Sequence, residues 1–337
     1  MFQSHERCGF FNSKGLSNSL AICLGVVMLM SSITAHATEW PTHVLRFLVP
    51  FPAGGSVDLQ ARAIADELSR AIGKPVIVDN KPGAGGNLAA AELARSPKDG
   101  HTLFIGTAST QAAAVSLYEK LSYDPVKDFE PLTSVTIYPL LIATSDSIKA
   151  KTLGELIETV KREGDNVTFG SAGVGAPSHL AGELFNQQVG TRARHIPYRG
   201  QPAAITDLIS GRIDMMFPSV PDALSMLKSG NMRALAIMAD RRSPLLPDVP
   251  TTAELGYPTL KGAIWTGVYT TSGVAPDVVE RLSAALIRIV ESKDFREKFE
   301  AMGYDVKSSS PEALRAFASE ETQRWGAVVK ASGIRLN

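Results

Sequence analysis

The chain has 337 residues, of which 44% are apolar, and its 34 basic side chains are matched by 34 acidic ones. This composition is typical of a globular protein and excludes disordered and collagen-like chains. A net charge of zero removes the broad attraction on which binding to nucleic acids and acidic membranes depends, so we expect no nucleic-acid partner.

The N-terminal segment has the three parts of a secretory signal peptide. Basic residues Arg7 and Lys14 precede an apolar run over residues 20–30, which is followed by small residues ending at Ala37. This pattern predicts a signal peptide over residues 1–37 that is cleaved after Ala37. The apolar run is too short to span about 30 Å of hydrocarbon, so we expect a soluble, periplasmic mature protein.

Both cysteines, Cys8 and Cys23, lie inside this predicted leader. The mature chain is therefore expected to lack a disulfide, a thiol nucleophile and a thiolate metal ligand. The residues before Cys23 match a lipoprotein box poorly, because Ile22 is large for its position and most of the apolar run follows the cysteine.

After the leader, short strand-like runs alternate with amphipathic helical stretches, which is typical of βα units around mostly parallel sheets. The first part of the chain predicts strands over 45–51, 76–78 and 101–107, with a helix starting at Asp58 and another ending at Arg95. An extended stretch follows around 129–144, and the alternation then restarts. The second part predicts strands over 167–170, 195–198, 213–217 and 234–238, and helices starting at 152, 177, 202 and 221.

The last seventy residues predict a strand over 265–271 and two helices that start near Pro276 and Pro311. Closing helices of this kind usually pack onto a domain that is already built. The sequence therefore predicts an α/β protein with two units joined by extended hinge strands.

Three glycine-rich turns lead from a predicted strand into a predicted helix, at 50–58, 82–87 and 170–175. Glycine lets backbone amides approach an anion, and a helix N-terminus adds about half a unit of positive charge. At Gly54 and Gly55 a positive φ would also favour glycine. Each turn alone is equally well explained as a tight connection, but three of them in both units favour a cleft lined by backbone donors.

Motifs for other chemistries are missing or incomplete. The 83–88 segment lacks the last small residue of the dinucleotide fingerprint, and no glycine-rich run ends in Gly-Lys-Ser/Thr, so no cofactor is expected. His179 and Glu183 have helical i, i+4 spacing but no evident third ligand, so no metal is expected. Tyr198 is either a ligand-facing hydroxyl or a packed aromatic, and a structural role is favoured for Asp214. No pair of acids suits general acid–base catalysis.

Five segments in this order resemble the receptors of tripartite tricarboxylate transporters, also called the Bug receptor family. The resemblance covers about Pro41 to Gly333. It rests on 49–55 followed by Asp58, on 80–86, on 170–173 with His179 and Leu180, on 197–200, and on 246–251 before Glu254. Lys81 and Thr271 depart from the family, which often has arginine and proline at these places.

The resemblance implies a two-domain periplasmic-binding-protein fold of type II, the Venus-flytrap fold, which closes over a small organic anion and delivers it to a membrane permease. Domain 1 is expected to comprise residues 38–138 and 263–337, and domain 2 residues 139–262. In the family, backbone amides and water hold the ligand carboxylate at the loop that matches 51–58. The expected ligand-binding residues are Phe51, Ala53, Gly54, Gly55, Ser56, Asp58, Gly85, Thr107, Ser109, Ser171, Gly173, His179, Tyr198 and Gly200.

A receptor that captures a carboxylate or dicarboxylate and acts as a monomer without catalysis is therefore the expected function. One alternative is an exported enzyme acting on a small carboxylic acid, with His179 and Asp58 as acid–base candidates. Another is a ligand-sensing receptor that signals to a partner protein instead of feeding a permease.

Overall fold

The computed structural model describes residues 1–3, 6, 9, 40–333 and 335–336, and residues from His43 onwards form one compact unit. Most of the predicted signal peptide, including its cleavage site and both cysteines, lies outside the described residues. In the described part of the chain, none of the helices combines the length and apolar character that crossing a bilayer requires.

The unit that starts at His43 contains two sheets. The first has six strands, in spatial order β11 (Asp305–Val306), β4 (Phe129–Pro139), β10 (Ala263–Thr271), β3 (Thr102–Thr107), β1 (Leu45–Val49) and β2 (Val76–Asn80). The second has five, in the order β7 (Arg194–Pro197), β6 (Thr168–Ser171), β8 (Met215–Met216), β5 (Leu141–Thr144) and β9 (Arg233–Ile237). Helices flank both sheets, which confirms the predicted α/β class.

The expectation of mostly parallel sheets is wrong, because both sheets are mixed. β1 pairs in parallel with β2 and β3, whereas β10 runs antiparallel to β3 and β4, and β4 runs antiparallel to β11. In the second sheet, β6 is parallel to β7 and β8, and β5 is antiparallel to β8 and β9. Parallel neighbouring strands need a crossover connection, usually a helix, between them. β4, β5 and β10 instead belong to segments that pass from one sheet to the other, and they pair antiparallel with their neighbours.

The two passages between the sheets lie side by side. The first joins β4 to β5 at Leu140, and the second runs through Gly262 into β10. The Leu140 amide donates to the Gly262 carbonyl at 2.8 Å, and the Met238 amide donates to the Leu140 carbonyl at 2.9 Å. The extended connections expected from the sequence are therefore hydrogen-bonded to each other.

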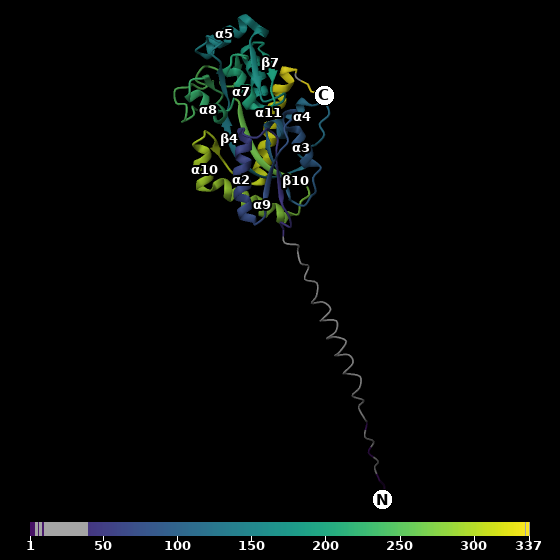
Figure 1. Cartoon of the computed structure of the whole chain (residues 1–337). Helices are drawn as coiled ribbons and strands as arrows, with labels where there is room; N and C mark the ends of the chain where they lie inside the picture. Colours follow the sequence, from purple (N-terminus) through teal and green to yellow (C-terminus); the bar gives the residue numbers. More distant parts are fainter. Residues whose placement is uncertain (4–5, 7–8, 10–39, 334, 337) are drawn as a thin grey trace. The chain divides into compact units, whose positions relative to one another are not determined.

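The helices are α2 (Ser56–Ile72), α3 (Asn87–Ala94), α4 (Ala114–Leu117), α5 (Leu153–Glu163), α6 (Pro177–Val189), α7 (Gln201–Ile209), α8 (Val220–Lys228), α9 (Pro276–Glu291), α10 (Lys293–Glu300) and α11 (Pro311–Ser332). Within the unit that starts at His43, α5 lies at one end and α9 at the other (Figure 1). Helix α10 was not predicted, because only Phe295 and Phe299 of its eight residues are buried and the rest are mostly charged.

A buried carboxylate fixes α11 to the first sheet. Oε2 of Glu321 accepts hydrogen bonds from the indole nitrogens of Trp265 in β10 and Trp325 in α11, both at 3.0 Å. Both tryptophans are buried, so Glu321 satisfies two donors that would otherwise be cut off from water.

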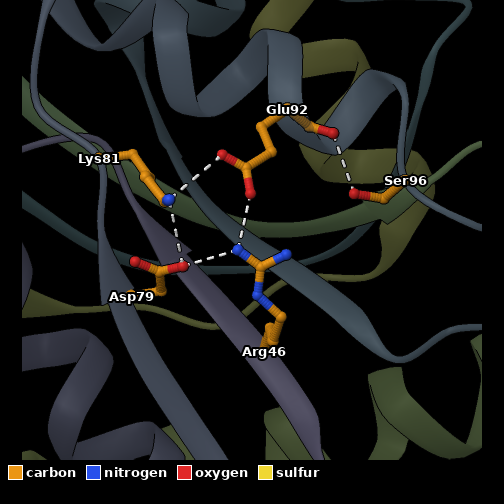
Figure 2. Close-up of polar contacts among 5 residues, drawn as sticks. All are labelled: Arg46, Asp79, Lys81, Glu92 and Ser96. Carbon is orange, nitrogen blue, oxygen red and sulfur yellow. Dashed lines mark hydrogen bonds and ion pairs between the residues drawn. The ribbon is translucent and has the colours of Figure 1, made fainter.

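A four-residue charge network holds β1, β2 and α3 together beside the second glycine turn (Figure 2). The Arg46 guanidinium contacts Asp79 and Glu92, both at 2.6 Å, and Lys81 lies 3.6 Å from Asp79 and 3.7 Å from Glu92. These carboxylates raise the pKa of Arg46. Lys81, one of the departures from the family pattern, therefore takes part in this structural network.

Candidate functional site

Four helix N-termini meet at a small cavity of about 40 Å³. The turn after β1 leads into α2, and the N-termini of α6, α7 and α8 approach it from the elements of the second sheet. The cavity is lined by Phe51, Pro52, Gly55, Ser56, Val57, Ala172, Pro177, Ser178, Gln201, Pro202, Asp222 and Ile264. Because each helix N-terminus carries partial positive charge, the convergence of four favours an anionic or strongly electronegative group.

A larger groove of about 800 Å³ lies beside the passages between the sheets. Its cationic side chains are Arg241, Arg242, Lys261 and Arg324, and the last three form ion pairs with Glu254, Asp240 and Glu321. Most of these charges are paired and offer less to a ligand than the four converging helix N-termini do, so the smaller cavity is the better candidate site.

The most direct link across the cavity joins Ser56 in α2 to Asp222 in α8. The Ser56 amide donates to Oδ1 of Asp222 at 3.1 Å, and Ser56 Oγ donates to Oδ2 at 3.2 Å. Ser219 Oγ also donates to Oδ2, at 2.7 Å. Burial raises the pKa of Asp222, and the hydrogen bonds from Ser219 and Ser56 oppose this rise.

Three buried polar side chains, those of Tyr138, Tyr304 and Gln60, donate hydrogen bonds to Ser56. Tyr138 donates to Ser56 Oγ at 3.3 Å, and Tyr304 donates to the Ser56 carbonyl at 3.1 Å. Gln60 also donates to this carbonyl, at 3.1 Å. Burial raises the pKa values of both tyrosines, so both phenols stay protonated and act as donors.

Gln201, the first residue of α7, lines the same cavity and carries a buried side-chain amide. Its exposed fraction is 8%, and its Nε2 donates to none of the described residues. A buried donor of this kind costs free energy unless something accepts its hydrogen bond.

Several backbone amides of the glycine turns donate hydrogen bonds to acceptors within the same turn. The Gly54 amide donates to Asp58 at 2.9 Å, and the Gly173 amide donates to Ser171 Oγ at 3.1 Å. The amides of Gly55 and Val57, which line the cavity, donate to no described residue. The predicted lining by backbone donors is therefore concentrated at the first turn of α2. A positive φ occurs at Gly54 (+85°) but not at Gly55 (−82°).

Asp58 is buried, but its carboxylate organises the first turn and does not line the cavity. It accepts hydrogen bonds from Gly54, Arg62 and Asn80, all at 2.9 Å. Burial alone would raise the pKa of Asp58, but these hydrogen bonds lower it below its usual value. The predicted helix cap is also corrected, because α2 begins at Ser56 and Gly55 is the residue before it.

The expected residues of the second turn also lie outside the cavity lining. Ser109 Oγ donates to the Gly85 carbonyl at 2.9 Å and lies 2.8 Å from Thr107 Oγ1. A Cβ at Gly85 would come within 2.9 Å of the Val174 carbonyl oxygen, so the second and third turns are in direct contact.

His179 and Ser171 form part of a packed histidine cluster. Nδ1 of His179 accepts from the Gly175 amide at 3.0 Å, and its ring stacks on that of His195 at 3.9 Å. Ser171 Oγ lies 2.6 Å from Nε2 of His195. Burial, with a contribution from His179, lowers the pKa of His195 to about 3.

Of the fourteen expected residues, three line the cavity: Phe51, Gly55 and Ser56. Tyr198 does not, because its hydroxyl donates to Asp207 at 2.8 Å. Gly200 has φ +111° and lies against Pro52, where an added Cβ would come within 2.8 Å of the proline ring. Ala53 and Gly54 are exposed beside the cavity.

Gln201, Asp222 and Ser178 were not among the expected ligand-binding residues. Each lies in the first turn of a helix that follows a strand of the second sheet, and Pro177, Pro202 and Pro221 mark these helix starts in the sequence. The proline positions were available as a signal, but nothing local indicated that these helix N-termini converge.

Comparisons with known proteins agree with this architecture. Residues 60–334 match the family model described as "Tripartite tricarboxylate transporter family receptor". Protein BugT of Bordetella pertussis is 34% identical over 320 residues, which cover 94% of this chain and 98% of that protein.

Two solved structures are similar over most of the chain. R. palustris Rpa4515 with adipate has a TM-score of 0.84 and 31% identity, covering 88% of this chain and all of that one. MatC from Rhodopseudomonas palustris with bound malate has a TM-score of 0.82 and 34% identity, covering 86% of this chain and all of that one. On the family match and these likenesses, the chain belongs to the receptor family of the tripartite tricarboxylate transporters.

Proposed function

We propose that this protein is an exported receptor that binds a small carboxylate in the cavity between α2, α6, α7 and α8. The observation that carries the proposal is the convergence of four helix N-termini on one cavity, whose lining includes Gly55 and Val57, two residues whose amides donate to no described residue. Similar structures were solved with adipate and with malate, both of them dicarboxylates, which supports the ligand class.

The receptor is proposed to close by moving its two sheets together. Residues 43–138 and 263–337 would form one domain and 139–262 the other, with the hinge at the hydrogen-bonded passages around Leu140 and Gly262. The close contacts of Gly200 with Pro52 and of Gly85 with Val174 support a geometry in which the turns of the two sheets meet. Hinge closure of this kind commonly reports ligand occupancy.

Export through a signal peptide ending at Ala37 and delivery of the ligand to membrane permease subunits complete the proposal. A solved relative is described as the periplasmic binding protein BugD, which supports the periplasm as the location. We propose a monomer that acts without a cofactor.

Ligand contacts are proposed first for Phe51, Gly55 and Ser56, which line the cavity. The other expected residues would act by shaping the turns around it. The enzyme alternative gains no support, because the His179 ring and the Asp58 carboxylate are engaged by Gly175 and by Gly54, Arg62 and Asn80.

The test uses the full chain expressed with its own leader and purified from the periplasmic fraction. N-terminal sequencing should find residue 38 first. After removal of co-purified ligand, melting temperatures are measured against mono-, di- and tricarboxylates, amino acids and aromatic acids. An acid at a hundred times its Kd should stabilise the protein by about 2.7 kcal/mol, a shift of several degrees.

Recovery of the bound acid unchanged separates a receptor from an enzyme. If no carboxylate shifts the melting temperature, the carboxylate assignment fails while the family membership stands. If the acid is consumed with time, the exported-enzyme alternative replaces the receptor. Co-purification with a permease fragment or with a sensor domain decides between delivery and signalling.

A further inference from the structure

Asp222 places a negative charge where a carboxylate ligand is expected. Its two oxygens accept hydrogen bonds from the Ser56 amide, Ser56 Oγ and Ser219 Oγ, so its carboxylate lies at the N-terminus of α2. No lysine or arginine is among the described residues that line the cavity. The charge of Asp222 is therefore met only by neutral donors and helix dipoles.

A partly buried carboxylate without a cationic partner is costly, and a second carboxylate beside it adds repulsion. A plain acid bound near the N-terminus of α2 meets this repulsion and gains no hydrogen bond from Asp222. A ligand that brings a hydrogen-bond donor to Asp222 instead gains a charge-assisted hydrogen bond.

The lining of the same cavity also includes donors that no described residue uses. Nε2 of the buried Gln201 donates to no described residue, and neither do the amides of Gly55 and Val57. These three groups suit the oxygens of a ligand carboxylate. The cavity thus combines one carboxylate acceptor with several donors, which is the complement of a molecule that carries both a donor and a carboxylate.

We propose that Asp222 selects the ligand: it accepts a hydrogen bond from a hydroxyl or ammonium group, while Gln201 and the α2 amides hold the carboxylate of the same molecule. This inference rests on the proposed receptor function and narrows its ligand to hydroxy acids or amino acids. The hydroxyl and the ammonium share the donor chemistry, and the experiment separates them.

The test measures Kd by calorimetry for matched sets of acids that differ only in the donor. The sets are propionate, lactate and alanine; succinate, malate and aspartate; glutarate, 2-hydroxyglutarate and glutamate; and adipate with its 2-hydroxy and 2-amino derivatives. In at least one set, the wild-type protein should bind a donor-bearing acid at least about tenfold more tightly than the plain acid, the effect of one good hydrogen bond.

Asp222→Asn keeps the size of the side chain and an oxygen for the Ser56 amide, but removes the charge. If the preferred ligand carries an ammonium group, this variant should lose about tenfold or more in its affinity and bind the plain acid more tightly. If the preferred ligand carries a hydroxyl, the loss should be smaller, because the Asn oxygen still accepts a hydrogen bond. Gln201→Leu should weaken the binding of every acid of the set by a similar factor.

Asp277→Asn is the matched control, because Asp277 is an exposed acid in the first turn of α9, which, like α8, has a proline near its start. It should leave every Kd unchanged, and unfolding curves without ligand confirm that each variant is folded. If the wild type binds plain and donor-bearing acids equally, or if Asp222→Asn keeps the full preference of the wild type with no loss of affinity for the donor-bearing acid, the inference is overturned and the receptor function stands. If no acid binds to the wild type, the receptor assignment fails together with the inference.

Discussion

The backbone amide of Ser56 donates to Oδ1 of Asp222 at 3.1 Å, although the two residues are 166 positions apart. Ser56 begins α2, which follows the first strand of the six-stranded sheet, and Asp222 lies in the first turn of α8, which follows a strand of the other sheet. The bond therefore connects two helix N-termini across the candidate cavity. This hydrogen bond is therefore both a contact between the two parts of the fold and a part of the candidate site.

Gly200→Ala is expected to weaken ligand binding. An added Cβ would come within 2.8 Å of the Pro52 ring and would occupy a backbone with φ +111°, so the turns around the cavity could not approach as closely. A loss of about 1.4 kcal/mol from the closed state corresponds to about tenfold in Kd, measured by calorimetry.

Gly190→Ala is the control for this prediction. Gly190 also has a positive φ, of +67°, but an added Cβ would meet nothing within 4 Å. It should lower stability modestly and leave Kd unchanged. Equal affinities in both variants would show that the contact of Gly200 with Pro52 plays no part in binding.

Asp214→Ala is expected to destabilise the second sheet. Oδ2 of Asp214 accepts from the Thr168 amide at 2.8 Å and from Thr168 Oγ1 at 2.7 Å, which links the turn before β8 to β6. Loss of hydrogen bonds to a charged acceptor should lower the free energy of unfolding by about 2–3 kcal/mol in urea titrations. Asp146→Ala removes an acid whose side chain is 78% exposed in its ion pair with Arg233, and should change stability by less than about 1 kcal/mol.

Glu321→Ala is expected to loosen the packing of α11. The substitution leaves the indole nitrogens of Trp265 and Trp325 without their shared acceptor in a buried environment. Two unsatisfied donors should cost about 2–4 kcal/mol in chemical unfolding, with a change in tryptophan fluorescence. Glu320→Ala, at the exposed neighbouring position, serves as control, and an equal loss in both variants would contradict the assigned role of Glu321.

Stability is expected to fall as the pH falls from about 6.5 towards 3. Burial beside His179 lowers the pKa of His195 to about 3, whereas in the unfolded chain it is near 6.5. Between these values the unfolded state binds a proton that the folded state does not, so acid favours unfolding. The contribution is fully present above pH 6.5, and its slope is at most about 1.4 kcal/mol per pH unit, reduced by the solvent that reaches the ring.

Urea titrations from pH 7 to 5 measure this slope, and nitrogen NMR shifts report whether the His195 ring stays neutral at pH 5. His195→Gln should flatten the slope in that range. A wild-type His195 that titrates near pH 6.5 would contradict the prediction.

Local patterns predicted most of the secondary structure. The helix predicted to start at 177 begins there as α6, and its proline suits the first helical turn. Thr152 also caps α5 as its spacing with Glu155 predicts, accepting from the Glu155 amide at 3.2 Å. Where local signals were weak, as in charged α10, the helix was missed.

The candidate site was only partly predictable. The glycine turn and the family resemblance together placed the loop over 51–58 at the expected ligand site, and Phe51, Gly55 and Ser56 do line the cavity. Tyr198 and His179 were expected beside them from their places near other turns, but their polar atoms are engaged by Asp207 and Gly175. A sequence position gives the element that carries a side chain, not the partner that takes its hydrogen bond.

The sequence by itself determined the α/β class, the order of most elements and the family, because these depend on periodicity, turn chemistry and motifs that are local in the chain. Only the tertiary structure decided that both sheets are mixed and that Gln201 and Asp222 face Ser56. The reason is physical: strand direction and the meeting of helix N-termini depend on where distant segments cross, and no local propensity encodes contacts between residues 166 positions apart.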